Sequence, residues 1–309
     1  MFIEQAYKGD NTPWKVLLTS GITMAIFIAN LIMFLFSTKE DMDAAYELMK
    51  QIPTHLSFII NLGVFIPILV LLLVLVKFMH ERSLLSLTTS RKKVDFKRIL
   101  FSFSLIFIFT IFSFALGYYL TPENYVYQLD VPNFIILVVL SLILFPFQIG
   151  LEEYLFRGFL MQQIGVAAKN KWVPLIVTSV LFGIFHSANP EVAAMGAITM
   201  VFYIGTGLLL GIMTLMDEGM ELALGFHFGN NFLAATLVTS QYSALQTDSL
   251  FMSTSETATS SEIILPVLIV YPIFLIILAY KYKWTGWREK LFGRVEPPQK
   301  IIDEHLVAD

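Results

Sequence analysis

The sequence predicts an all-α protein, a polytopic integral membrane bundle of about eight transmembrane helices. Of its 309 residues, 56% are apolar and 14% are charged, whereas soluble domains carry about 25% charged residues. The mean hydropathy of +0.72 points to the same class. The third observation is that apolar runs of about 20 residues, the length that crosses a hydrocarbon core, recur along the chain.

The eight predicted spans are 14–36, 56–79, 98–119, 133–163, 172–188, 193–215, 219–240 and 263–282. We expect the first to be a retained helix, because it lacks the basic start and cleavage site of a signal peptide. The fourth is longer than a bilayer requires, so it should tilt, project into water or kink at Pro146. The fifth closes at the turn signal Asn189-Pro190. The fifth to seventh are rich in Gly and Ala, as closely packed membrane helices are.

Lys and Arg are divided unevenly between the two sets of loops. With eight crossings both termini share one side. The segments on that side, with the flanking Arg98 and Lys281, hold fifteen Lys and Arg, whereas the opposite segments hold only Lys39 and Lys50. This asymmetry predicts that both termini are cytoplasmic. The loop RKKVDFKR at 91–98 is the strongest anchor, and we interpret it as a topology determinant beside anionic lipid.

The chain divides into three parts by this pattern, and we see no internal repeat. Residues 1–132 hold the first three helices and the basic cytoplasmic loop, and residues 133–240 hold the candidate catalytic core. Residues 241–309 hold an outer loop, the last span and a cytoplasmic tail. We expect residues 38–52 to form an amphipathic surface helix, the Ser- and Thr-rich 240–262 to be a mobile loop, and the tail to be partly disordered.

Three charged residues interrupt the fourth span, in the string LEEYLFRG. Glu152, Glu153 and Arg157 are the only charges between Val131 and Ala168. A charged group at the centre of a membrane helix costs about 2.5–3.5 kcal/mol, so three together indicate a functional site. The alternative is a buried ion-pair network that fixes helix packing.

Two histidines lie well inside predicted spans, and each has a companion four residues away. At this spacing two side chains share one face of a helix. Three pairs have it: Glu153 with Arg157, Phe182 with His186, and His227 with Asn231. Glu152 is rotated by about 100° from its neighbour, so one glutamate can face a cavity while the other pairs with Arg157. Ordinary core hydrogen bonding is the alternative for both histidines and for Asn231.

These residue types are sufficient for peptide-bond hydrolysis. A carboxylate in a low-dielectric cavity can take a proton from water and return it to a leaving amine. One histidine can orient that water, while a second histidine and an Asn amide donate to the developing oxyanion. None of them is a covalent nucleophile, and the absence of cysteine removes thiol nucleophiles, thiolate metal sites and disulfides. No mid-span Asp pair or GxSG-like serine suggests another intramembrane protease.

The three motifs, in order on three helices, resemble those of a known family. EEYLFR, FGIFH and HFGNN match the EExxxR, FxxxH and HxxxN patterns of the CPBP family. That family contains type II CAAX-prenyl-protease-like proteins and bacteriocin-processing or immunity proteins, also called Abi proteins. The resemblance covers roughly residues 133–240 without departure from the three patterns. It implies an intramembrane endopeptidase.

The resemblance also implies roles for individual residues. Glu152 would activate water, His186, His227 and Asn231 would stabilise the oxyanion, and Glu153 with Arg157 would support them. The resemblance leaves open whether the site holds a metal. One interpretation is a metal-free site, and the other is a zinc metalloprotease with Glu152, His186 and His227 as ligands. We favour the metal-free reading, because the chain has no HExxH helix.

We therefore expect a membrane-embedded endopeptidase in a bacterial plasma membrane, with its polar cavity reached from the cytoplasmic side. Its substrate would be a peptide or protein, lipidated or membrane-anchored in some family members, and nothing indicates nucleic-acid binding. The alternatives are a non-enzymatic immunity or scaffold protein and a proton-coupled transporter. One difficulty is the depth of these residues in the membrane. Counted from the cytoplasmic helix ends, Glu152 lies about 17 Å deep, His227 about 12 Å and His186 about 21 Å, whereas a shared site needs these depths to be closer.

Overall fold

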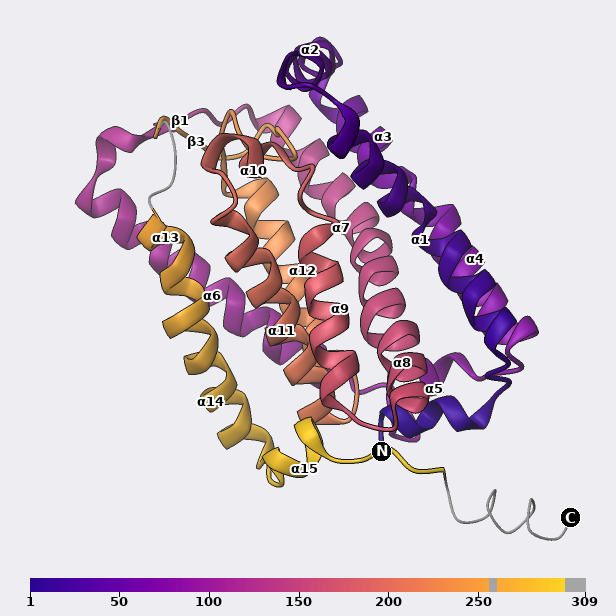
Figure 1. The fold of residues 1–309 in the computed structure, drawn as a ribbon. Helices are drawn as coiled ribbons and strands as arrows, with labels where there is room; N and C mark the ends of the chain where they lie inside the picture. Colours follow the sequence, from indigo (N-terminus) through magenta and orange to yellow (C-terminus); the bar gives the residue numbers. More distant parts are fainter. Residues whose placement is uncertain (256–259, 298–309) are drawn as a thin grey trace, which may run out of the picture.

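Long apolar helices run between two ends of the molecule and make up most of the chain (Figure 1). This is a computed structural model, and it describes residues 1–255 and 260–297. In that part of the chain, six helices are long and apolar enough to cross a membrane: Pro13–Phe36, Thr54–Met79, Phe96–Leu120, Val131–Ala168, Thr199–Asp217 and Ile263–Tyr282. The predicted all-α polytopic bundle is confirmed, whereas the count of eight crossings is not.

The elements follow one another as in Figure 1. The first part holds η1 (Ile3–Lys8), α1 (Pro13–Phe36), α2 (Lys39–Lys50), α3 (Thr54–Gly63), α4 (Phe65–Val74), η2 (Leu75–Met79), α5 (Leu84–Thr88) and α6 (Phe96–Leu120). The middle part holds η3 (Pro122–Asn124), β1 (Tyr125–Tyr127), α7 (Val131–Glu153), η4 (Tyr154–Leu160), α8 (Met161–Ala168), α9 (Trp172–Ile184), α10 (Pro190–Met195), α11 (Thr199–Asp217) and α12 (Glu221–Thr236). The last part holds β2 (Val238–Thr239), β3 (Phe251–Ser253), α13 (Ser260–Leu265), η5 (Pro266–Val270), α14 (Tyr271–Tyr282) and α15 (Trp287–Phe292).

The fifth and seventh predicted spans are helical but short. α9 has 13 residues and α12 has 16, so they are about 20 Å and about 24 Å long, less than the ~30 Å hydrocarbon core. Both pack against longer helices, α9 against α11 and α12 against α6 and α7. The predicted sixth span begins later than expected, at Thr199, because Gly196 takes a φ of +81° and separates α11 from α10.

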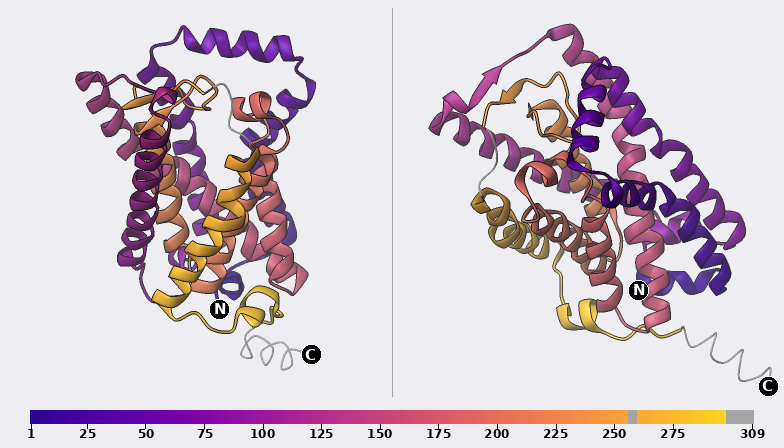
Figure 2. Two further views of the ribbon diagram at one scale, coloured as in Figure 1. Left: turned by 90° about the vertical axis from the view of Figure 1, so that its left-hand side faces the viewer. Right: turned by 45° about the horizontal axis from the view of Figure 1, so that its top comes forward.

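The upper end of the bundle carries a small sheet that the sequence did not predict. Its strand order is β1-β3-β2, with β1 antiparallel and β2 parallel to β3. The segment 240–262, predicted as a mobile loop, therefore contains a paired strand at Phe251–Ser253, although residues 256–259 lie outside the described chain. Strands of two or three residues are too short to show the alternation that identifies a strand in a sequence. The predicted surface helix is present as α2, which lies across this end (Figure 2).

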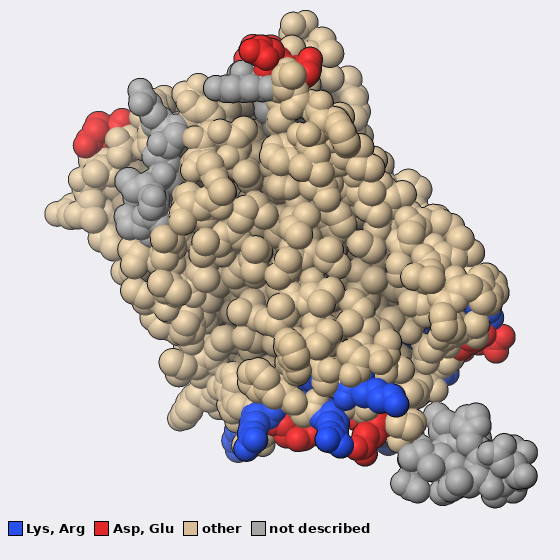
Figure 3. Space-filling view, viewed as in Figure 1, with Lys and Arg blue, Asp and Glu red and all other residues tan. Residues whose placement is uncertain are grey.

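Both the start and the late part of the described chain lie at the lower end. The Lys171 backbone N–H donates to the Gly293 carbonyl at 3.1 Å, and the Lys171 ammonium lies 3.3 Å from the Met1 sulfur. An even number of crossings places them in this way. A wide uncharged surface separates the two ends, and Lys and Arg gather at the lower one (Figure 3). Residues 298–309 of the tail lie outside the described residues.

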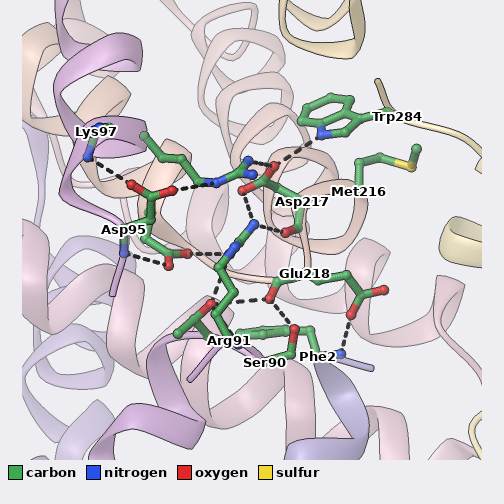
Figure 4. Close-up of polar contacts among 12 residues, drawn as sticks. Phe2, Ser90, Arg91, Asp95, Lys97, Met216, Asp217, Glu218 and Trp284 are labelled. Carbon is green, nitrogen blue, oxygen red and sulfur yellow. Dashed lines mark hydrogen bonds and ion pairs between the residues drawn. The ribbon is translucent and has the colours of Figure 1, made fainter. Parts of the chain in front are cut away.

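A buried polar network closes the lower end and fixes where α12 begins (Figure 4). Arg91, from the basic loop, pairs with Asp217 at 2.7 Å and with Glu221 at 3.0 Å. Arg98 pairs with the other oxygen of Asp217, which also accepts from the indole N–H of Trp284 at 3.1 Å. The loop predicted only as a topology determinant thus also joins α6, α11 and α12.

The span that carries EEYLFR is more buried than most of the others. In Val131–Ala168, 44% of the most apolar window is buried inside the protein, against 11% in α6, whose outer face is left for lipid. Two glycines let α12 approach α6 closely: a Cβ at Gly225 would collide with the Ile99 carbonyl and the Ser102 hydroxyl, and one at Gly229 with Ile106. Close approach through small residues is the usual way that membrane helices pack.

We predict that Gly225→Ala destabilises the protein by about 1–3 kcal/mol, because the added methyl group pushes α12 from the Ile99 backbone. Gly21→Ala is the matched control, since a Cβ there meets no atom within 4 Å and Ala favours helix over Gly. Thermal unfolding in detergent measures both. Equal melting temperatures for the two variants would contradict the close contact of α12 with α6.

Candidate active site

An ion pair that is entirely buried anchors the site. Glu153 ends α7 and Arg157 lies in the π-helical turn η4, and both side chains are 0% exposed. The Arg157 Nη1 donates to the Glu153 Oε1 at 3.0 Å, and the Arg157 Nη2 donates to the Gly207 carbonyl of α11 at 3.2 Å. The guanidinium carbon lies 4.4 Å from the ring centre of Phe182 on α9. Arg157 therefore holds three helices together in the low-dielectric interior.

His227, from α12, lies between the two adjacent glutamates. Its Nδ1 is 2.9 Å from the Glu153 Oε1, and its Nε2 is 3.4 Å from the Glu152 Oε2. A neutral imidazole donates through one nitrogen only, whereas an imidazolium donates through both. Only the imidazolium could therefore donate to both carboxylates at once. The histidine is buried, so this cluster is shielded from bulk water.

Gln148 connects Glu152 to Asn231. The Gln148 amide nitrogen donates to the Glu152 Oε1 at 2.5 Å, and the Asn231 amide nitrogen donates to the Gln148 Oε1 at 3.1 Å. Asn231 keeps a second N–H, because an amide nitrogen carries two. The sequence reasoning missed Gln148, although a polar residue one helical turn before Glu152 in an apolar span was a signal that could have identified it.

His186 lies beside this cluster and is joined to it through an aromatic ring. It follows the end of α9, and its Nδ1 lies 2.6 Å from the Phe182 carbonyl. Since a carbonyl only accepts, the Nδ1 carries the hydrogen and the Nε2 of the neutral ring is an acceptor. The ring stacks on Tyr203 at 4.6 Å and lies 4.5 Å from the Phe182 ring, which is 5.9 Å from that of His227. Tyr203 was also missed, because stacking between helices has no local pattern.

The structure thus brings five of the six predicted residues into one cluster, joined by hydrogen bonds and by the 3.4 Å contact of His227 with Glu152, with His186 one ring away. The depths counted along separate helices suggested a wider spread. The helices are staggered, however, so depths counted from their separate ends do not share one origin. α8 extends the fourth span past the start of α9, and α12 begins at the buried lower network. Phe182, the first residue of the FxxxH pattern, packs between Arg157 and both histidines.

The side chains proposed as zinc ligands do not converge as a ligand set. A catalytic zinc takes three protein ligands at about 2.0–2.2 Å. In the part of the chain that the structure describes, no group of three or more His, Asp or Glu side chains is arranged to hold a metal ion. His227 directs both nitrogens at carboxylates and His186 directs its Nδ1 at a carbonyl. The geometry therefore does not fit a zinc ion held by Glu152, His186 and His227.

Comparison with known proteins relates this cluster to a family. Residues 131–233 match the family model described as Rce1-like, type II CAAX prenyl endopeptidase. The central segment of this chain is therefore similar to that family. All six predicted site residues lie inside it, and the match confirms the resemblance that the three motifs indicated. The Rce1-like segment supports a membrane protease of the CAAX-protease type in general.

A relative from Bacillus subtilis (strain 168) aligns over more of the chain. It is described as the uncharacterized protein YyaK and is 28% identical over 251 residues, which cover 76% of this chain and 81% of the relative. The similarity therefore extends beyond the Rce1-like segment. No solved structure matches the chain.

We predict that Arg157→Met destabilises the protein by about 3–5 kcal/mol, because it leaves the Glu153 carboxylate buried without its cation. Adding Glu153→Gln should restore part of that loss, since the double variant contains no unpaired charge. Chemical or thermal unfolding in detergent of the four proteins completes the cycle. Strictly additive losses would mean that the two side chains do not depend on each other.

Proposed function

We propose that this protein is an intramembrane endopeptidase that hydrolyses a peptide bond with water activated by Glu152. The observation that carries the proposal is the position of His227, in contact with both adjacent carboxylates while Asn231 and His186 lie beside them. Glu152 has one oxygen, Oε2, that accepts no hydrogen bond within the described chain and faces the imidazole. That oxygen is available to a water molecule.

In the first step, water attacks the substrate carbonyl carbon and a C–O bond forms. Glu152 takes the water proton as general base, and the acceptor Nε2 of His186 orients the same water. The carbonyl oxygen becomes an oxyanion. The protonated His227 and the second N–H of the Asn231 amide donate to it, in a site where hydrogen bonds to a developing charge are strong.

In the second step, Glu152 returns its proton to the amide nitrogen and the C–N bond breaks. The immediate products are a carboxylic acid and an amine, between which the acid proton then passes, and the enzyme regains its starting protonation. Glu153 and Arg157 do not touch the reacting atoms in this proposal. They position His227 and stabilise its positive charge through the 2.9 Å contact with Glu153. Gln148 is likewise a positioning residue, because it orients both Glu152 and Asn231.

We predict that Glu152→Gln lowers the turnover of a cleaved peptide by about 10²–10⁴-fold, because the amide cannot accept the water proton. Glu123→Gln is the control, as Glu123 is an exposed carboxylate at the upper end, outside the site. Comparative peptidomics of cells with the wild type and each variant identifies the lost products. Their cleavage is then timed with purified protein in liposomes.

Full cleavage by Glu152→Gln would contradict the proposal. A phenotype that survives in this variant without any cleavage would favour an immunity or scaffold protein. Proton-coupled uptake into liposomes that is lost in the variant would favour a transporter.

We also predict that cleavage survives prolonged dialysis against a strong chelator, with less than about a twofold loss. The reason is that Glu152, His186 and His227 do not form a set of three ligands. Elemental analysis of the same sample measures the remaining zinc. Inactivation that zinc alone reverses would show that these residues rearrange around a metal.

A further inference from the structure

A cavity of about 320 Å³ opens at the upper end of the bundle, opposite the chain start and the basic loop. Its walls come from α10, the small sheet and the turn after β2, and its polar lining is mostly hydroxyl groups. The described residues with polar side chains that line it include Tyr125, Glu191, Thr239, Ser240, Tyr242 and Ser243. Its volume lies in the range of sites for small ligands or a few residues of peptide. By contrast, a cavity of about 10 Å³ at the lower end is too small for a ligand.

Two segments lead from this cavity to the catalytic cluster. On one side, Asn189 donates to the Tyr203 hydroxyl at 3.0 Å, and Tyr203 stacks on His186. On the other side, α12 carries Asn231 and continues into Val238 of β2, which lines the cavity. Seven residues of mostly helical chain span about 10 Å. An extended peptide covers that distance with about three residues.

Glu191 gives the cavity a preference for charge. Its Oε1 accepts from the Ala244 backbone N–H at 2.7 Å, while its Oε2 is buried without a hydrogen-bond partner among the described residues. Burial raises the pKa of the Glu191 carboxyl, the direction expected for a carboxylate that lacks a counter-charge. A positively charged donor would supply both the missing hydrogen bond to Oε2 and the missing counter-charge.

The surrounding surface has the same preference. The predicted outer segments 37–55, 120–132, 189–192 and 241–262 contain ten Asp and Glu against two Lys. Acidic side chains are visible at this end in Figure 3. A surface of one sign attracts ligands of the opposite sign and raises their local concentration.

We propose that this cavity admits the substrate, and that the substrate is a peptide segment bearing a basic residue that pairs with Glu191. The inference rests on the proposed function and names the substrate class of the same site. It also places access at the end opposite the Lys- and Arg-rich loops. The positive-inside rule assigns those loops to the cytoplasm, and therefore the cavity to the outer face of the membrane. This replaces the access from the cytoplasmic side that the sequence suggested.

The side of access is tested with single cysteines, because the chain has none of its own. We expect a membrane-impermeant maleimide to label Ser243→Cys in intact cells. Lys92→Cys, in the exposed basic loop, should be labelled only after the membrane is opened. Ser253→Cys, also in the cavity wall, serves if Ser243→Cys does not fold. Labelling of Lys92→Cys but not of the cavity cysteine in intact cells would overturn the assigned side.

The charge preference is tested by protection of the same cysteine. The probes are two acetylated hexapeptides that differ only in carrying two lysines or two glutamates. We expect the lysine peptide to slow labelling of Ser243→Cys and the glutamate peptide to leave it unchanged. Glu191→Gln should weaken the protection about tenfold or more, while Glu123→Gln, at the same end but outside the cavity, should not. Equal protection by both peptides, or protection unaffected by Glu191→Gln, would overturn the proposal.

The same measurement in Glu152→Gln separates this inference from the proposed function. Protection by the lysine peptide should persist there, because Glu152 is not part of the cavity wall. Protection without cleavage in the wild type would refute the endopeptidase and leave the binding site. Cleavage of the lysine peptide with a KM that Glu191→Gln does not change would refute the binding site and leave the endopeptidase.

Discussion

A guanidinium held in the dry interior by a single carboxylate is the constraint on which the rest of this structure depends. A charge in a low-dielectric medium is tolerated only when it is paired and its hydrogen bonds are made. Arg157 meets most of this requirement, since it pairs with Glu153 and donates to the Gly207 carbonyl while its Nε has no partner among the described residues. The pair thus fixes α7 against α11. The same Glu153 oxygen also contacts His227. The ion pair therefore sets the height of α12 as well, and the neighbouring Glu152 remains outside the pair.

The two ends of the bundle are built differently, and the difference suits the proposed enzyme. The lower end is closed by ion pairs of Arg91 and Arg98 with Asp217, and the close contact of Gly225 with α6 holds α12 in place. The upper end carries short helices, a small sheet and a polar cavity. Rigid support below a site and open, polar structure above it keep the reacting groups in position while a ligand enters and leaves. The buried cluster lies between these two regions.

The sequence predicted part of the buried cluster because the relevant spacing is local. Residues four apart on a helix share a face, so the pairing of Glu153 with Arg157 follows from the order of residues alone. The contacts between helices do not, because their relative heights depend on packing and not on any repeat. Gln148 shows the limit well: its contact with Glu152 is local, but its contact with Asn231 joins positions 83 residues apart. The stacking of Tyr203 on His186 is likewise a meeting of two elements.

By itself the sequence determined the helical membrane class, the positions of the long apolar helices and the three motifs whose residues form the buried cluster. These follow from hydropathy and from the 3.6-residue period, which act over one or two helical turns. The tertiary structure decided that His227 stands between the two glutamates, and that the cavity of about 320 Å³ opens away from the basic loop. Those outcomes depend on burial and close packing among distant segments, where one unpaired charge or one added methyl group changes the stability of the packed state.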